Sequence, residues 1–383
     1  MSSKFYGERL RQLRLINDKS LLEVGEAILT TKQYIQQLET DVQSPTELTL
    51  NALASYFNVA PRFFEIPYSN RIYETDCYFR KAKSTPSNVK EKAQHFASLL
   101  EEYVNFIEEE FELPLISFLD KDFDYKTLSQ NQIEQAADEL RLAWGLDLDT
   151  PIDNMTKALE NAGAIVTYFS ELSDKVDAFS INRKRPIVIR NNEKDSGCRL
   201  RFDLAHECGH LVLHKFIDNS FEDEIKEEQA NRFASAFLLP RRGFCKEFYE
   251  IFLGSRINWS RMLKLKERWK VSFGAIVRRA YDLGMIDAVK YRGACIYLRK
   301  SGQAKKEQGD DYIEIEESNL LTNITKTLVN DYVLDIVDFV KNRGWSEELI
   351  EKITSVNLPK LKEAIMLNSS SKIVDINQYR FSS

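Results

Sequence analysis

Residues 206–210 read His-Glu-Cys-Gly-His, and three of the four histidines of the chain (His206, His210 and His214) fall within nine residues. In an α-helix, His206 and His210 lie one turn apart on the same face, so both imidazoles can reach one metal ion. Glu207 follows the first histidine, where it could hold and deprotonate a metal-bound water without binding the metal itself. The stretch therefore predicts a helix that carries two metal ligands and a base.

This spacing is the H-E-x-x-H arrangement of zinc metallopeptidases. The alternative is a pair of hydrogen-bonded histidines on a buried helix, because short motifs also occur by chance. A catalytic zinc usually takes three protein ligands and keeps one position open for water. His214 lies about 12 Å from His206 along a straight helix and cannot bind the same ion. We expect His214 to support a ligand or to end the helix.

A carboxylate from a later helix is the remaining ligand type. Residues 222–228 are rich in acids, and apolar residues follow them at helical spacing. These apolar residues are Ala230, Phe233, Ala234 and Phe237. At about 100° per residue, Glu227 falls at the edge of the apolar face, whereas Glu228 points away from it. We predict Glu227 as the third ligand, with Glu224 or Glu228 as alternatives, and Asn231 as a hydrogen-bond partner of a ligand.

Composition describes an ordinary globular protein. The 383 residues suffice for two or three domains, with 43% hydrophobic and 29% charged residues. The five scattered cysteines form no C-x-x-C pair, which favours reduced thiols. No apolar run is long enough to span a membrane, and the first thirty residues lack the pattern of a signal peptide. We therefore expect a cytoplasmic protein that does not bind membranes, and the net charge of −6 gives no global attraction to nucleic acid.

Hydrophobic periodicity predicts an α+β protein that is mostly helical and has one small sheet. Helices are expected within 5–66, at 87–111, 131–144, 152–162, around His206, at 223–238, within 260–284 and over most of 311–383. Short apolar or β-branched runs at 164–169, 178–181 and 186–190 predict the sheet, and Tyr291–Leu298 favours another strand. Residues 67–90 are polar and contain two prolines, which is typical of a linker.

The N-terminal helices predict a helix-turn-helix, with a second helix at about 20–28 and a recognition helix at about 31–39. The outward-facing residues of the recognition helix are the expected DNA contacts: Thr31, Lys32, Gln33, Gln36 and Gln37. Glutamine suits adenine, and Lys32 or the helix N-terminus suits phosphate. Residues 1–66 hold seven Lys/Arg against eight Asp/Glu, a net charge of −1, so dimerisation or partner recognition is the alternative to DNA binding.

Two segments carry a resemblance to the ImmA/IrrE family of metallopeptidases. Residues 201–210 read R-F-D-L-A-H-E-C-G-H, similar to the family pattern R-F-x-x-A-H-E-x-G-H. Residues 227–234 read E-E-Q-A-N-R-F-A, similar to E-x-x-A-N-x-F-A. The resemblance implies that His206, His210 and Glu227 bind Zn²⁺ and that Glu207 is the catalytic base.

The resemblance extends over most of the chain. Tyr78-Phe-Arg-Lys81 and Leu265–Ser272 are similar to segments of longer family members, and residues 5–66 look like their Cro/CI-type (XRE) helix-turn-helix domain. The resulting organisation has four parts. They are a helix-turn-helix domain at 1–66, a helical linker region at 67–145, a zincin-like metallopeptidase domain with a small sheet at 146–300, and a helical C-terminal region at 301–383.

Two functions fit this organisation. The first is an intracellular, zinc-dependent, site-specific endopeptidase that cleaves a helix-turn-helix repressor, the substrate class implied by the resemblance. Its extended substrate would add along an edge of the 178–190 sheet. The second is a DNA-binding transcriptional regulator whose peptidase-like domain serves as a sensor or dimerisation platform with little proteolysis. Double-stranded DNA would bind through residues 1–66 in either case, and a homodimer remains an open alternative to a monomer.

Overall fold

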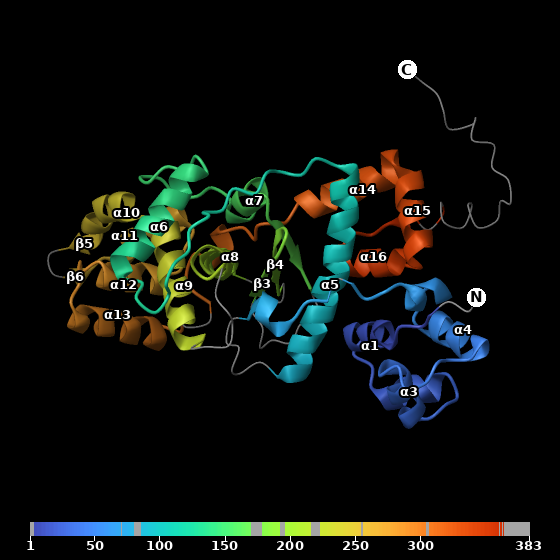
Figure 1. Cartoon of the computed structure of the whole chain (residues 1–383). Coiled ribbons are helices and arrows are strands. Elements are labelled where there is room, and N and C mark those ends of the chain that lie inside the picture. The colour runs from blue at the N-terminus through green and yellow to red at the C-terminus, as the bar shows by residue number, and fades with distance from the viewer. Residues whose placement is uncertain are drawn as a thin grey trace, which may run out of the picture. The chain divides into compact units, whose positions relative to one another are not determined.

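The computed structural model describes residues 4–69, 71–79, 86–169, 178–191, 196–215, 223–253, 256–303, 306–359, 361 and 363. Helices dominate, and the described strands form one mixed four-stranded sheet and one two-stranded ribbon (Figure 1). This confirms the predicted α+β fold with one small sheet. None of the described helices is long and apolar enough to cross a membrane. All five cysteines are free.

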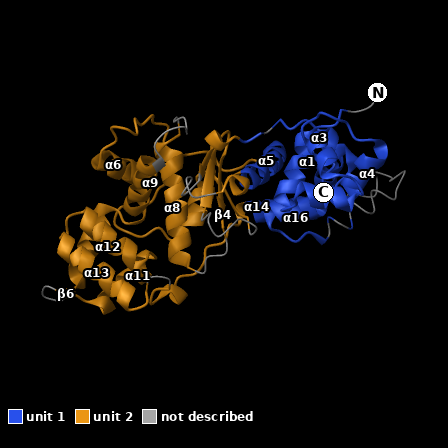
Figure 2. Cartoon of the chain, turned by 90° about the horizontal axis from the view of Figure 1, so that it is seen from below, with its two compact units in different colours: residues 1–72, 91–111, 321–383 blue, residues 73–90, 112–320 orange. Residues whose placement is uncertain are grey.

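The chain divides into two compact units (Figure 2). Unit 1 contains Met1–Ile72, Glu91–Phe111 and Leu321–Ser383, and unit 2 contains Tyr73–Lys90 and Glu112–Leu320. The four parts drawn from the sequence do not coincide with these units. The long helix after residue 90 and the C-terminal helices group with the helix-turn-helix segment.

Unit 1 begins with four short helices. They are α1 (Gly7–Ile16), α2 (Leu21–Ala27), α3 (Lys32–Glu39) and α4 (Glu47–Tyr56), followed by the 3₁₀ turn η1 (Pro61–Glu65). Side chains cap three of them, since Ser20, Thr31 and Thr46 each accept a backbone N–H three residues on. Helices α2 and α3 lie where the sequence predicted the helix-turn-helix.

The helix-turn-helix segment is built into the rest of unit 1. The other helices are α5 (Ser87–Glu110), α14 (Leu320–Asp331), α15 (Val333–Arg343) and α16 (Glu347–Thr354). Arg9 of α1 forms a buried ion pair with Glu102 of α5, with 2.7 Å between Nη2 and Oε1. Ala60 donates its N–H to the carbonyl of Gly344 at 2.9 Å. Breaking a buried ion pair costs about 3–5 kcal/mol, so deletion of residues 1–66 would destabilise the remainder of unit 1.

The sheet of unit 2 has the strand order β1-β3-β4-β2. The strands are β1 (Cys77–Phe79), β2 (Ile165–Tyr168), β3 (Ala178–Asn182) and β4 (Pro186–Arg190). Strands β2 and β4 are parallel, whereas β3 is antiparallel to both β4 and β1. The sequence predicted β2, β3 and β4 but missed β1, because three residues are too few to show an alternating pattern.

The described residues of unit 2 also form eight helices, of which α7 and α8 pack on the sheet. They are α6 (Gln130–Ala143), α7 (Met155–Asn161), α8 (Gly197–Leu213), α9 (Asp223–Leu238), α10 (Arg241–Phe248), α11 (Trp259–Trp269), α12 (Phe273–Asp282) and α13 (Ala288–Lys300). The short elements are η2 (Glu74–Asp76), η3 (Tyr249–Ile251), η4 (Asp310–Tyr312) and the ribbon of β5 (Phe252–Leu253) and β6 (Arg256–Ile257).

The prediction of a strand at Tyr291–Leu298 is wrong, because this segment lies in α13. Asp287 caps the helix by accepting the N–H of Lys290. Ala294 and Leu298, four residues apart, are its buried residues. The aromatic and β-branched content of the run favoured a strand, but burial on one helical face overrides that local preference.

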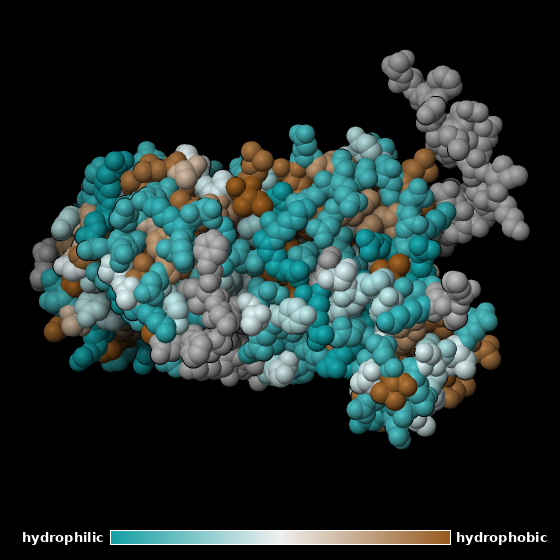
Figure 3. Space-filling view, viewed as in Figure 1, coloured by the Kyte–Doolittle hydropathy of each residue, from teal (hydrophilic) through white to brown (hydrophobic). Residues whose placement is uncertain are grey.

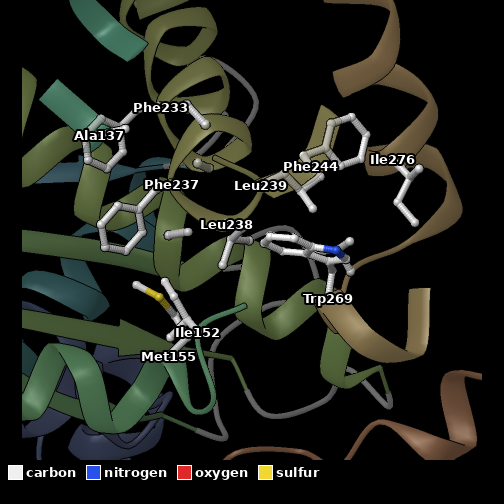
Figure 4. Close-up of a cluster of buried hydrophobic side chains, with 14 of the residues drawn as sticks. Ala137, Ile152, Met155, Phe233, Phe237, Leu238, Leu239, Phe244, Trp269 and Ile276 are labelled. Carbon is white, nitrogen blue, oxygen red and sulfur yellow. The ribbon is translucent and has the colours of Figure 1, made fainter. Parts of the chain in front are cut away.

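The core of unit 2 fixes α9 in place. Phe233 and Phe237 of α9 and Trp269 of α11 are fully buried in one cluster of apolar side chains (Figure 4). Two buried arginines bind carbonyls at the end of this helix: Arg141 Nη1 donates to Phe237 O at 2.6 Å, and Arg279 Nε donates to Leu239 O at 2.9 Å. Contacts at the C-terminal half of α9 therefore fix the position of the helix, including its first turns, which carry the acids.

Candidate metal centre

Helix α8 lies between α9 and the strands β3 and β4 (Figure 1). Its glycine, Gly209, sets the approach of α9. A Cβ atom at this position would lie 3.1 Å from Cα and 3.2 Å from O of Ala230, and 3.2 Å from Cβ of Phe233. A larger residue would push the two helices apart. The glycine of the 206–210 stretch thus lets α9 bring its acids beside the two histidines.

Three donor atoms converge where α8 and α9 meet. Nε2 of His206 lies 3.1 Å from Nε2 of His210, and Oε1 of Glu227 lies 3.1 Å from the latter atom. The other oxygen of Glu227 lies 3.5 Å from Nε2 of His206. Ligands about 2.0–2.1 Å from a tetrahedral zinc are separated by about 3.3 Å, which these spacings match. The three side chains form a group that could hold a metal ion.

Asn231 sets the orientation of the first imidazole. Its Oδ1 lies 3.0 Å from Nδ1 of His206. A carbonyl oxygen only accepts, so the ring donates from Nδ1 and leaves the lone pair of Nε2 free to point at the other donors. This is the supporting contact that the sequence predicted one turn after Glu227.

A longer chain of hydrogen bonds sets the second imidazole. Gln229 donates from Nε2 to the carbonyl of Tyr125 at 2.6 Å, so its Oε1 accepts from Nε2 of His214 at 3.0 Å. His214 then accepts at Nδ1 from Nδ1 of His210 at 2.9 Å. Burial, with a contribution from His210, lowers the pKa of His214 well below its usual range, so this ring is neutral. His210 therefore also presents a lone pair at Nε2.

The neighbouring acids differ in their surroundings. Glu227 is only partly exposed, and both of its carboxylate oxygens face the imidazoles of His206 and His210. Glu228 is exposed and pairs with Arg232, with 2.6 Å between Oε1 and Nη2. Glu224 is exposed as well. Only Glu227 of these three acids belongs to the group of converging donors.

The carboxylate of Glu207 is held by a residue that sequence reasoning missed. Ser180 of β3 donates its hydroxyl to Oε2 of Glu207 at 2.6 Å, and both residues are fully buried. The only sequence signal was a polar residue in the middle of the apolar strand Ala178–Asn182. Its pairing with the acid depends on contacts that are distant in sequence.

Strand β1 also reaches this site. The ring of Tyr78 stacks on the imidazole of His210, with 5.1 Å between centroids and 6° between planes. Its hydroxyl donates to the carbonyl oxygen of His214. Because β1 and β4 both pair with β3, the 178–182 strand has no open edge among the described residues. The edge strands of this sheet are β1 and β2, and β3 and β4 lie inside.

The predicted DNA contacts lie on α3 in unit 1. Lys32, Gln33 and Gln36 are exposed, and Gln37 is half-buried. Thr31 is exposed and caps the helix through a hydrogen bond from Tyr34 N at 3.1 Å. Four of the seven basic residues of this segment are engaged elsewhere in unit 1: Arg9 with Glu102, Arg11 with Glu91, Arg14 with Glu39, and Arg62 with the carbonyl of Asn342.

Side chains on the face drawn in Figure 3 are mostly hydrophilic, with small separate apolar patches. The helix-turn-helix segment contributes exposed apolar residues of its own: Leu22, Leu29, Val42 and Leu48. Scattered residues of this kind are ordinary on a protein surface.

A helix with the H-E-x-x-H spacing, joined by an acid from the next helix, is an arrangement typical of zinc metallopeptidases. Comparison with family models agrees, since residues 159–281 match the IrrE N-terminal-like domain of the M78 peptidases and residues 10–64 match the helix-turn-helix model. The chain therefore carries an IrrE N-terminal-like peptidase domain and an XRE-type helix-turn-helix domain. A comparison with curated proteins found no match.

Proposed function

We propose that the chain is a zinc-dependent endopeptidase that cleaves a helix-turn-helix repressor. The observation that carries the proposal is the convergence of two imidazole lone pairs and one carboxylate, beside a second buried carboxylate that is not part of the group. Two acceptor nitrogens and an anion facing one another favour a bound cation. Two nitrogens and one oxygen are a donor set typical of catalytic zinc.

The chain's own residues divide the work of hydrolysis. A zinc ion held by His206, His210 and Glu227 would polarise the scissile carbonyl and lower the pKa of a water molecule. Glu207 accepts the proton of the attacking water and passes it to the leaving amine nitrogen. The hydroxyl of Ser180 holds Oε2 of Glu207, so we assign the proton transfer to Oε1.

The substrate class follows from the second domain of the chain. A helix-turn-helix domain could bring the peptidase to a repressor, by sitting on the same operator or by pairing with the repressor itself. Either route raises the local concentration of a weakly recognised cleavage segment. Proteomics of cells that express the wild type or Glu207→Gln should show the repressor cut only in the wild type. Reproducible cleavage of proteins unrelated to transcription alone would contradict this substrate class.

One observation favours the second candidate function, a regulator with little proteolysis. His206 and Glu207 are both 0% exposed, so the first histidine and the base do not meet solvent in this arrangement, although the side chain of Glu227 is 23% exposed. The two functions separate in a purified system that contains the candidate repressor and its operator. Cleavage by the wild type and none by Glu207→Gln supports the peptidase, whereas operator binding without cleavage supports the regulator.

DNA binding by unit 1 should be weak and only moderately dependent on salt. Three arginines of the segment pair with acids, so Lys4, Lys19, Lys32 and Arg62, whose partner is a neutral carbonyl, carry the remaining positive charge. At about 0.9 per neutralised phosphate, the slope of log K against log salt should be no steeper than about −4 per protomer. Titration of a labelled operator by fluorescence anisotropy at several salt concentrations measures this slope. A much steeper slope would mean that other basic residues contact the duplex.

Base recognition should depend on the three glutamines of α3. Replacing Gln33, Gln36 and Gln37 with alanine should relax sequence preference more than it weakens non-specific binding, because these side chains suit base edges. The full-length protein is used, since residues 1–66 are built into unit 1. Absence of duplex binding at low salt would favour a protein partner for this surface. If cleavage of the repressor slows in the triple variant, this helix takes part in bringing the peptidase to the repressor.

Removal of His214 should weaken zinc binding although this residue is not a ligand. His214→Phe keeps an aromatic ring but gives Nδ1 of His210 no acceptor, so the lone pair of Nε2 is no longer fixed toward the metal. Loss of such a supporting partner typically costs 10–100-fold in metal affinity, and we expect a change of about that size. Competition with a chromophoric chelator measures the affinity, with Glu228→Ala as the control. Unchanged affinity in a folded variant would show that the hydrogen bonds from His210 through His214 to Gln229 have no influence on zinc binding.

A further inference from the structure

Strand β1 lies along the edge of β3 that faces the candidate active site. In the antiparallel register, Cys77 is opposite Ile181 and Tyr78 is opposite Ser180. Ser180 is the residue that holds Glu207. The backbone of β1 therefore passes the catalytic carboxylate as an extended strand. Peptidases and other peptide-binding proteins often hold an extended segment in this way, by adding it to a sheet edge.

The side chain of Tyr78 occupies the space over a metal ligand. Its ring is parallel to the imidazole of His210, and its hydroxyl binds the carbonyl oxygen of His214 at the end of α8. A ring stack together with a hydrogen bond at the tip is a pair of contacts that suits an amphipathic side chain. A substrate residue in the same register would meet the same two contacts.

Strand β1 covers part of the site in this position. His206 and Glu207 are 0% exposed and His210 is 2% exposed, and the ring of Tyr78 lies on His210, so an extended peptide cannot pair with β3 beside these residues while β1 is there. Strand β1 has only three residues and no strand on its outer side among the described residues. It also lies outside the residues that match the peptidase domain model. These features make β1 the segment most easily exchanged.

We propose that β1 is a pseudosubstrate strand, which holds the place of an extended substrate on β3 and must leave before cleavage. This inference rests on the proposed peptidase function. The preferred substrate is then an extended segment with an aromatic residue opposite Ser180, the position that Tyr78 occupies. The incoming strand regains the backbone hydrogen bonds that β1 loses. The main obstacle to the exchange is that β1 is tethered and therefore competes at a high effective concentration.

A reversible lock on β1 tests the proposal. Ile181→Cys places a thiol opposite Cys77, at a Cα separation that suits a disulfide in an antiparallel pair. Oxidation should slow cleavage of fluorogenic peptides at least tenfold and slow zinc loss to 1,10-phenanthroline at least tenfold. Dithiothreitol should restore both rates. The matched control, Ile181→Cys combined with Cys77→Ala, should not respond to oxidant. Equal rates in the locked and reduced protein would overturn the proposal.

A second variant separates this idea from the proposed function. Tyr78→Ala should raise peptide cleavage severalfold and keep zinc bound, and a peptide of residues 74–79 should inhibit it more strongly than its Tyr-to-Ala form. Lower cleavage by a folded, zinc-loaded Tyr78→Ala protein would show that β1 is only a structural strand. If no variant cleaves any peptide but the lock still slows zinc loss, the peptidase function fails while the closing role of β1 stands.

Discussion

Alanine at His206, His210 or Glu227 should each strip most of the zinc from the purified protein. Each change removes one of three donors, and two ligands do not hold a catalytic zinc against dialysis. The loss should exceed the 10–100-fold that removal of a supporting partner costs. Metal analysis after dialysis against a weak chelator gives the stoichiometry, which should be near one for the wild type.

The neighbouring acid supplies the matched control for this experiment. Glu228 is one residue from Glu227 but pairs with Arg232 at the surface, so Glu228→Ala should keep its zinc. Circular dichroism separates metal loss from unfolding, because His206 and His210 are buried. Zinc loss in Glu228→Ala together with full zinc in Glu227→Ala would exclude the arrangement proposed here.

Local periodicity explains why so much of this site was accessible from the sequence. The two histidines need only one helical turn between them, and the apolar face of α9 sets the phase of its acids. Phe233 and Phe237 are fully buried and Glu228 is exposed, as the pattern of 3.6 residues per turn predicted. A phase argument works for α9 because the first half of this helix has one buried and one exposed side, whereas α8 is buried on nearly all sides.

The rest of the site depends on contacts that no local pattern encodes. Ser180 meets Glu207 only because β3 packs on α8, and Tyr78 reaches His210 across more than a hundred residues of sequence. A strand as short as β1 shows no period at all. The same limit applies to unit 1, where Arg62 donates to the carbonyl of Asn342 at 2.7 Å. Contacts between residues far apart in the sequence decide which parts of the chain form one unit, and linker-like composition along the sequence does not show these contacts.

Glu207→Gln should abolish peptide cleavage while the protein keeps its fold and its zinc. The amide has the shape of the carboxylate, and its oxygen can still accept the hydroxyl of Ser180, so the buried contact at 2.6 Å is retained. An amide cannot take a proton from water, so the general-base contribution, typically 10²–10⁴-fold, is lost from kcat. Zinc stoichiometry and kcat are measured on the same preparation.

Ser180→Ala gives the graded comparison that makes this result specific. It leaves the carboxylate of Glu207 in place but removes the hydroxyl that orients it, so kcat should fall far less than in Glu207→Gln, and zinc should remain bound. If Glu207→Gln lost zinc, this residue would be a ligand instead of a base. If Glu207→Gln kept its full rate of cleavage, the proton of the attacking water would have to go to another residue. A large fall in Glu207→Gln with a small fall in Ser180→Ala fits only a base that sits beside the metal and is positioned from the sheet.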